Sequence, residues 1–341
     1  MASKNSEVVT KHRVKWMDFM GRTRPICLQD ENGPCPLLAI VNYLLLKGKL
    51  KIPAHARQVN STHLHKGLSK YLSEIILKKK EKEFEQIQDE AVIAEKKEEI
   101  TDLIEQYKVD VLPKLVNGLD VNLVFGGVDK FAFNRAIEIL NLFEIRLFHG
   151  WVVGPDDPAK AVLENLSYDE AVTTLIEKRG EVEANLIQDF MDMNATQLST
   201  QGLAKLYEAL EEGDLVIFFR NNHFSNVLKH NGLIYLLLTG EAYEYEPSVG
   251  WEILNDVTGA TEMVSPEFTS PGEYQDRLLA MQLTHGYYNP VPPKQGKKKV
   301  QSSKNGKGKV KAKTKDRNLA KKTKKSNFTL FQRKKGKMNK G

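Results

Sequence analysis

The sequence predicts a mixed α/β domain of the α+β type, followed by a basic carboxyl-terminal tail. Helical periodicity fills the first half of residues 1–265, and runs with the two-residue alternation of strands gather in the second half. The 341 residues are 41% hydrophobic and 28% charged, which is the composition of an ordinary globular protein and excludes disorder of the whole chain.

The first predicted helix begins at Cys35 or Pro36 and ends at Gly48. Proline suits the first turn of a helix because the N–H that it lacks would have no partner there. Apolar side chains cover most of the circumference of this helix: Leu37, Leu38, Ile40, Val41, Leu44 and Leu45. A helix that is apolar nearly all round belongs in the middle of a domain.

Residues 61–107 predict one or two further helices, since the segment has no proline and no glycine after Gly67. Lys and Glu dominate residues 78–99, so this part is expected to be solvated and to project from the domain. We interpret residues 61–108 as a helical insertion within the domain, with its charges on an exposed face.

The remaining elements follow in chain order. Gly118 ends a helix, and strands are predicted at residues 121–125 and 145–153. Helical periodicity is found at residues 134–143, 168–178, 181–193 and 201–211. Residues 214–240 then predict two or three strands, with the dipeptide Asn231-Gly232 as a hairpin turn.

Charge is divided unevenly along the chain. Residues 294–341 contain 20 Lys and Arg and one acidic residue, Asp316, for a net charge of +19, whereas the rest of the chain carries −13. The tail has little to bury, so we expect it to be disordered. Such a tail can make weak contact with RNA, ribosomes or an anionic surface, act as a nuclear address, or only keep the protein in solution.

The two cysteines, Cys27 and Cys35, cannot build a disulfide framework or a four-cysteine zinc site, and the polar first residues carry no secretory signal. We therefore expect a cytoplasmic protein, and the basic tail also suits a nuclear location. The apolar runs are too short to cross a bilayer, so we expect no integral membrane association.

Cys35 is a candidate nucleophile because it lies where the first helix begins. The positive end of the helix dipole and the unpaired N–H groups of the first turn favour a thiolate there. The alternative is a structural cysteine that packs as a small hydrophobe. Cys27, between Ile26 and Leu28 in a predicted strand, fits that alternative better.

A thiolate nucleophile needs a histidine that takes its proton and later protonates the leaving amine. His223 follows an apolar run and heads a predicted strand, so rigid sheet backbone could aim its imidazole at the helix that bears Cys35. His149 falls at the end of another strand. The other histidines lie in polar segments that we expect to be exposed, or near the end of the domain: His12, His55, His63, His65, His230 and His285. None makes a zinc-binding spacing with a cysteine, so no metal or other cofactor is predicted.

Gln29 lies six positions before Cys35 and is the candidate oxyanion donor. Attack on an amide carbonyl develops negative charge on oxygen, which the Gln29 amide and the backbone N–H of Cys35 could stabilise together. Glutamines are common in loops, so this role depends on Cys35 and His223.

The segment LQDENGPCPLLAIVNYLLL resembles the MINDY family of deubiquitinating cysteine peptidases, and LPKLVNGLDVN, FHGWVV, LSY and FFRNNHFSNVLKH follow in the family's order. The resemblance runs from about residue 24 to residue 238. It implies a variant papain-like fold with Cys35 as nucleophile, His223 as general base and acid, and Gln29 as oxyanion donor. Thr239 matches the residue that supports the catalytic histidine.

The family's substrate is polyubiquitin. The resemblance implies cleavage of isopeptide bonds, with a preference for chains joined through lysine 48 of ubiquitin and trimming from the distal end. The residues that would face ubiquitin are Val121, Trp151, Tyr168 and Phe219. Aromatic anchors are typical of such contacts, although Val121 and Phe219 lie on predicted strands and could equally belong to the core.

A predicted helix at residues 270–286 resembles the ubiquitin-interacting helix that follows the catalytic domain in this family. The residues that would carry the contact are Asp276, Leu279, Ala280 and Leu283. The small Ala280 would let the helix lie close to ubiquitin while the leucines fill the edges of its apolar patch. An ordinary amphipathic helix packed on the domain is the alternative.

Three functions therefore stand as hypotheses. The first is a thiol-dependent deubiquitinase, the second a polyubiquitin-binding protein with weak turnover, and the third a factor tethered to ribosomes or RNA through residues 294–341. The intact set of Gln29, Cys35 and His223 favours the first. No oligomer is implied. The charged insertion and the tail depart from the vertebrate members and bear on partners and location, not on the chemistry.

Overall fold

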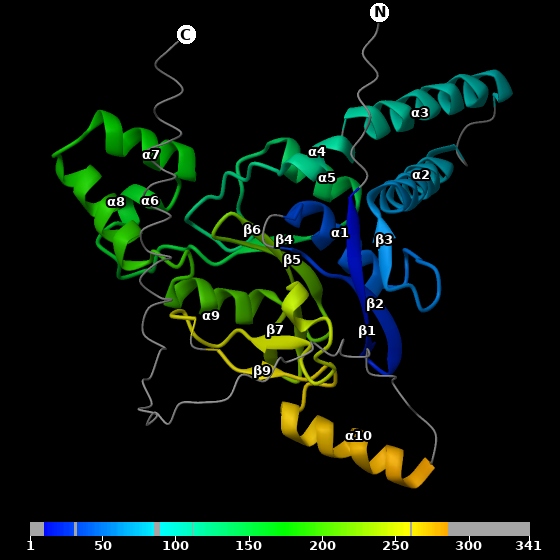
Figure 1. Cartoon of the computed structure of the whole chain (residues 1–341). Helices are drawn as coiled ribbons and strands as arrows, with labels where there is room; N and C mark the ends of the chain where they lie inside the picture. Colours follow the sequence, from blue (N-terminus) through cyan, green and yellow to red (C-terminus); the bar gives the residue numbers. More distant parts are fainter. Residues whose placement is uncertain (1–9, 31–32, 85–88, 111, 260, 286–341) are drawn as a thin grey trace, which may run out of the picture. The chain divides into compact units, whose positions relative to one another are not determined.

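The computed structural model describes residues 10–30, 33–84, 89–110, 112–259 and 261–285 (Figure 1). The predicted tail at residues 294–341 lies outside them. All described elements belong to the unit Met1–Tyr287. Within the described residues, no helix is both long and apolar enough to cross a membrane.

The elements alternate irregularly along the chain (Figure 1). The strands are β1 (Lys11–Phe19), β2 (Arg22–Cys27), β3 (Gln58–Asn60), β4 (Leu147–His149), β5 (Leu215–Arg220), β6 (His223–His230), β7 (Leu233–Leu237), β8 (Trp251–Ile253) and β9 (Met263–Val264). The helices are α1 (Cys35–Leu46), α2 (Ser61–Phe84), α3 (Glu90–Asp110), α4 (Leu112–Asn117), α5 (Arg135–Leu142), α6 (Lys160–Leu163), α7 (Tyr168–Glu177), α8 (Val182–Met193), α9 (Thr200–Ala209) and α10 (Pro271–His285), with a 3₁₀ turn at Glu241–Tyr243.

The described strands form two sheets, and the predicted mixed α/β class is confirmed. The smaller sheet has the order β2-β1-β3 and is antiparallel throughout. The larger sheet has the order β4-β5-β6-β7-β8-β9, in which β4 runs parallel to β5 and the other neighbours are antiparallel.

The smaller sheet corrects the expectation that the first half of the chain is helical. Its central strand, β1, escaped prediction because cationic residues interrupt the apolar side of its alternation. His12 and Lys15 are buried in this strand together with Val14, Met17 and Phe19. The sequence therefore reads as a polar terminus although the strand is largely inside.

Helix α1 begins at Cys35, as predicted, and ends at Leu46, two residues before Gly48. Pro36 lies in its first turn, and every residue of the helix except Cys35 and Tyr43 is buried. The helix packs against β2 of the smaller sheet and against β5 and β6 of the larger sheet (Figure 1). The cysteine at its amino terminus is therefore carried by a buried helix that contacts both sheets.

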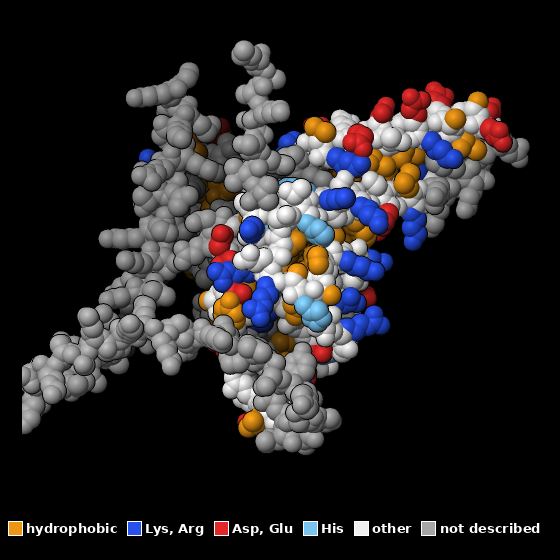
Figure 2. All heavy atoms as spheres, turned by 45° about the vertical axis from the view of Figure 1, so that its right-hand side comes forward, with side chains coloured by type: hydrophobic (Ala, Val, Ile, Leu, Met, Phe, Trp, Pro, Cys, Tyr) orange, Lys and Arg blue, Asp and Glu red, His pale blue; other side chains and the backbone are white. Residues whose placement is uncertain are grey.

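The predicted insertion forms the two helices α2 and α3, which contact each other. One side of the pair packs inward through Leu64, Leu68, Leu72, Ile76, Ile100 and Ile104. The other sides carry Lys and Glu residues, and Figure 2 shows acidic and basic side chains along the pair. The expected exposed charged face is thus present on the described residues.

Two predicted strands are shorter than expected. Residues 121–125 make only single-residue bridges, Leu123 with Phe131 and Val124 with Ser167, because no strand runs alongside them. Residues 145–153 contribute only β4, which ends where Gly150 meets the start of α9. A Cβ on Gly202 would lie 1.8 Å from the Gly150 carbonyl oxygen, so this close approach requires glycine at position 202.

The other predicted helices are confirmed as α5, α7, α8 and α9, and α10 forms where the 270–286 helix is predicted. Asn134, Ser167 and Ser199 accept hydrogen bonds from the first turns of α5, α7 and α9, which fixes where these helices begin. The predicted hairpin joins β6 to β7, with Asn231 and Gly232 at φ 49° and 75°. Strands β3, β8 and β9 are too short to leave a periodic signal.

Candidate active site

Cys35 is the first residue of α1 and is half-buried. Burial raises the pKa of its thiol, while hydrogen bonds from the backbone of Phe224 and from its own backbone act to lower the pKa. The contact with Phe224 brings the sulfur to the beginning of β6, beside the residue that follows His223. Two segments almost 190 residues apart in the sequence therefore meet at the thiol.

His223 is the first residue of β6 and pairs with Arg220 across the β5–β6 turn. Asn221 and Asn222 form this turn with φ 53° and 58°, a left-handed backbone that asparagine tolerates well. The side chain of Gln197 also accepts a hydrogen bond from the N–H of Asn221 at 2.8 Å. Burial lowers the pKa of the His223 imidazole, so the neutral form is favoured.

Gln29 and Thr239 lie side by side, because the N–H of Gln29 donates to the carbonyl of Thr239 at 2.7 Å. The carbonyl of Gln29 in turn accepts from the N–H of Glu241 at 3.1 Å. Thr239 comes two residues after the end of β7. The main chain at Thr239 and Glu241 is therefore held by the segment that leads to Cys35.

A cavity of about 540 Å³ collects three of the four residues predicted to take part in the chemistry. It is lined by Gln29, Asp30, His223, Thr239, Gly240, Glu241 and Ala242. Cys35 is not among the lining residues, and Phe224 links it to this group. The structure thus brings Gln29, His223 and Thr239 together and sets the Cys35 thiol beside the strand that bears His223.

The side chain of Gln29 is engaged within its own loop. Its Nε2 donates to the carbonyl of Gly33 at 3.0 Å. A Cβ on Gly33 would lie 2.8 Å from Asp30 Oδ1 and 2.9 Å from Gln29 Cγ, so a larger residue there would displace the side chains of Asp30 and Gln29. An oxyanion role for Gln29 requires this amide to turn toward the reacting carbonyl.

Two cationic residues of β1 hold the segment 241–249, whose first two residues line the cavity, and sequence reasoning missed both. Lys15 is buried, and its Nζ donates to the carbonyls of Tyr243 at 2.9 Å, Glu246 at 2.7 Å and Val249 at 2.6 Å. Burial lowers the pKa of Lys15 to about 8. Arg13 pairs with Glu241 at 3.3 Å and with Glu244.

Alternation along the strand Lys11–Phe19 places Arg13 and Lys15 on the same face. This alternation is the sequence signal that could have found them. Both side chains meet the segment 241–249, whose first residues line the cavity. Strand β1, which the sequence did not predict, therefore supports one side of the candidate site.

The other cysteine and two other histidines are internal. Cys27 is buried at the end of β2, and burial raises its pKa to about 12, which fits the structural alternative. His149 is also buried, and burial lowers its pKa to about 4. The expectation that His12 is exposed is wrong, because β1 buries it and its pKa is lowered. Within the described residues, no group of three or more His, Cys, Asp and Glu is placed to hold a metal.

The residues proposed to face ubiquitin lie in or on one apolar core. Trp151 and Phe219 are 5% and 6% exposed, whereas Val121 and Tyr168 are partly exposed and pack against the same core. The rings of Trp151 and Tyr168 are 6.0 Å apart. Val121 and Tyr168 therefore offer surface to a partner, and contact of Trp151 or Phe219 with ubiquitin stays a prediction.

The first residues of helix α10 contact the rest of the domain, and residues further along the helix are exposed to solvent. Tyr274 is buried, Gln275 donates to Ser248 Oγ at 3.1 Å, and Arg277 pairs with Glu267. Asp276 and Leu279 are exposed, Leu279 at 55%. Ala280 and Leu283 belong to the helix, but their side chains lie outside the described part of the structure.

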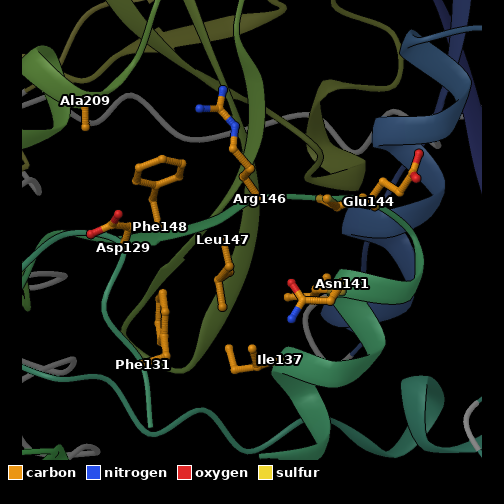
Figure 3. A pocket seen from close by; sticks show the side chains of 11 residues that line it. Asp129, Phe131, Ile137, Asn141, Glu144, Arg146, Leu147, Phe148 and Ala209 are labelled. Atoms are coloured by element: carbon orange, nitrogen blue, oxygen red, sulfur yellow. The ribbon is translucent and has the colours of Figure 1, made fainter. Parts of the chain in front are cut away.

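A second cavity of about 520 Å³ lies between α5, β4 and the segment 129–131. Figure 3 shows Ile137 and Asn141 of α5 and Leu147 and Phe148 of β4 around it. Its arginine, Arg146, pairs with Asp214 at 2.5 Å and lies over the ring of Phe148. No cysteine or histidine lines it, so it does not offer peptidase chemistry.

Comparison with known proteins supplies an independent finding. The MINDY deubiquitinase family matches residues 10–268. Ubiquitin carboxyl-terminal hydrolase MINDY-1 of Danio rerio is 36% identical over 262 residues, which cover 75% of this chain and 48% of that protein. MINDY-2 of Bos taurus is 37% identical over 265 residues, with 75% and 40% covered. MINDY-1 of Homo sapiens is 36% identical over 266 residues, with 75% and 53% covered. The chain thus spans about half the length of these relatives.

Proposed function

This chain belongs to the MINDY deubiquitinase family, and from this membership we propose that it is a thiol-dependent isopeptidase that hydrolyses polyubiquitin. The observation that supports the proposal best is the cavity shared by Gln29, His223 and Thr239, together with the backbone contact between Phe224 and the Cys35 thiol. No other described cysteine is free to react, since Cys27 is buried and its pKa is raised to about 12.

In the proposed reaction, His223 takes the proton of the Cys35 thiol, and the sulfur attacks the carbonyl carbon at the carboxyl terminus of ubiquitin. The Gln29 amide and the backbone N–H of Cys35 stabilise the negative oxygen that forms. The C–N bond then breaks as His223 gives its proton to the leaving lysine amine. Water, deprotonated by His223, hydrolyses the thioester and returns the thiol.

The finer features of the substrate are part of the proposal. We infer from the motif resemblance a preference for chains joined through lysine 48 of ubiquitin and trimming from the distal end. Val121 and Tyr168 would contact ubiquitin, and Trp151 and Phe219 would support or join that contact. Asp276 and Leu279 on the open side of α10 would engage a further ubiquitin, with Ala280 and Leu283 on the same helix.

Cleavage of defined chains tests the proposal. Wild type is expected to shorten lysine-48-linked tetra-ubiquitin faster than lysine-63-linked chains of equal length. Cys35→Ala should leave the chains intact, and His223→Ala should lose at least about 100-fold in rate because no group then moves the proton. Cys27→Ala serves as the matched control and should cleave. Equal cleavage by wild type and Cys35→Ala would refute the assignment of the nucleophile.

One observation favours a binding protein with weak turnover as the second candidate. Burial raises the pKa of Cys35 and lowers that of His223, and both shifts favour the uncharged form of the group. Gln29 is also engaged with Gly33. Single-turnover assays with enzyme in excess separate the two functions, since a pure binder leaves the chain whole at every enzyme concentration.

A further inference from the structure

Helix α1 is packed almost entirely through apolar side chains. Burial of apolar surface has no preferred direction, and this helix is apolar on nearly every side, so a directional hydrogen bond adds a separate constraint on its register. A slip of one residue along a helix moves a side chain by about 1.5 Å. Because Cys35 is the first residue of α1, such a slip would move the thiol relative to both neighbouring sheets.

Asn42 is the one polar residue among the buried residues of α1, and it is 1% exposed. Its Oδ1 accepts a hydrogen bond from the N–H of Cys27 at 2.7 Å, and its Nδ2 donates to the carbonyl of Cys27 at 3.0 Å. Cys27 ends β2, two positions before Gln29. This directional pair of bonds sets both the rotation and the height of α1 against the strand that leads to Gln29.

Asn226 makes the corresponding link to the other sheet. It lies on β6, three positions after His223, and is 1% exposed. Its Nδ2 donates to the carbonyl of Ala39 at 2.9 Å, and Ala39 is one helical turn after Cys35. A buried amide without a hydrogen-bond partner costs free energy of folding. A shift of α1 along β6 would break this bond and leave the Asn226 amide unpaired, so the bond favours the observed alignment.

We propose that Asn42 and Asn226 are positioning residues that set the place of the Cys35 thiol relative to Gln29 and His223. The inference rests on the proposed function, because these three residues are the proposed catalytic groups. Each asparagine ties α1 to one of the two strands that lead to a partner of the thiol. Neither lines the catalytic cavity, so both act through the backbone of other residues.

The alignment matters more for the reaction step than for substrate binding. A misplacement of about 1 Å in a catalytic group can cost about 100-fold in rate. Ubiquitin would bind through surface residues that neither asparagine touches. Loss of either link should therefore lower kcat and leave KM nearly unchanged.

The test uses Asn226→Leu and Asn42→Leu, in which leucine keeps the branching of the side chain and its number of heavy atoms and removes the amide. Val227→Ala is the matched control for lost stability. Val227 neighbours Asn226 on β6 and is buried, but it packs in a different apolar cluster from that of α1. Asn226→Asp and Asn42→Asp keep the shape of the side chain and remove its donor, and they take the same test if a leucine variant does not fold.

Reaction of each full-length variant with ubiquitin bearing a carboxyl-terminal electrophile separates binding from the covalent step. Each asparagine variant should keep the half-saturating ubiquitin concentration within about two-fold and react about 10- to 100-fold more slowly. Val227→Ala should react as wild type does despite a lower Tm.

Wild-type rates in the asparagine variants, or an equal slowing in Val227→Ala, would overturn the inference. A wild-type protein that binds ubiquitin without reacting would instead overturn the proposed function.

Discussion

Burial favours the neutral thiol at Cys35 over the thiolate. Burial raises the pKa of Cys35 and lowers that of His223, and the hydrogen bond from Phe224 only partly offsets the burial of the sulfur. A thiolate paired with an imidazolium would require the opposite shifts. We therefore expect the charged pair to form when substrate covers the site, not before.

The reactivity of Cys35 toward a small electrophile checks this expectation. Alkylation by iodoacetamide proceeds through the thiolate, so a raised pKa moves the rise in rate toward higher pH. The rate, followed by mass spectrometry from about pH 6 to about pH 10, should keep increasing above pH 8.5. Cys27 is the internal control and should stay unmodified in the native protein. A plateau reached below about pH 7 would mean that an ion pair exists in the free protein.

Lys15 stabilises the segment that follows the cavity lining and touches no proposed catalytic group. Its ammonium holds the carbonyls of Tyr243, Glu246 and Val249. Lys15→Met leaves these carbonyls without their donor and should lower the free energy of unfolding by about 2–4 kcal/mol. Urea denaturation measures the change.

Lys11→Met is the matched control, because Lys11 lies on the same strand and is exposed. An equal, small effect for both variants would show that the three hydrogen bonds contribute little.

At this scale the sequence predicts a residue only where its neighbours carry a signal. Cys35 could be found because prolines and glycine mark a helix start, and His223 because it heads an apolar strand. Arg13 and Lys15 could not, because a buried lysine looks like any surface lysine until its three carbonyl partners, more than 200 residues away, are known.

Among the elements, the long ones were predictable and the short or disguised ones were not. The nearly continuous apolar residues between Pro36 and Gly48 predict helix α1, and the dipeptide Asn231-Gly232 predicts the β6–β7 hairpin. The segment 121–125 has the alternation of a strand but finds no neighbour to pair with along its length. The alternation of apolar and polar residues is a property of a single strand. A sheet also needs a neighbouring strand, which can lie far away in the sequence.

Helix α10 carries a prediction that separates binding of long chains from chemistry. Leu279 and Asp276 are exposed, so Leu279→Ala with Asp276→Ala should leave Tm within about 1 °C because no buried contact is lost. Affinity for lysine-48-linked tetra-ubiquitin should fall by about ten-fold, as for loss of an apolar anchor. Reaction with the monomeric ubiquitin electrophile should not change.

Tyr274→Ala is the contrasting variant. Because Tyr274 is buried, its loss should weaken the packing of α10 on the domain and lower Tm. Unchanged tetra-ubiquitin affinity in the double variant would remove α10 from the binding surface.

For the molecule as a whole, charge is separated along the chain. Residues 10–80 hold 14 Lys and Arg against four Asp and Glu, although the chain up to residue 293 carries a net −13. Figure 2 shows basic side chains gathered on the face that it brings forward. Together with the 20 cationic residues of 294–341, this gives the protein two basic regions in an otherwise acidic chain.

Deleting residues 294–341 tests whether these charges bind a polyanion. Affinity for a fluorescent single-stranded RNA should fall on deletion, and the steep loss of affinity between about 50 and 200 mM salt should become shallower, because fewer counterions are released. Cleavage of tetra-ubiquitin should be unaffected. An RNA affinity and salt dependence equal to those of the full chain would refute a role of the tail in such binding.

In the proposed function, the thiol at the start of α1 and the imidazole at the start of β6 act together on the carboxyl terminus of ubiquitin. The most direct measurement is peptide mapping of the adduct formed with ubiquitin that carries a carboxyl-terminal electrophile. The modification should fall on Cys35, should be lost in Cys35→Ala, and should form far more slowly in His223→Ala. An adduct on Cys27, or one that persists in Cys35→Ala, would contradict the account.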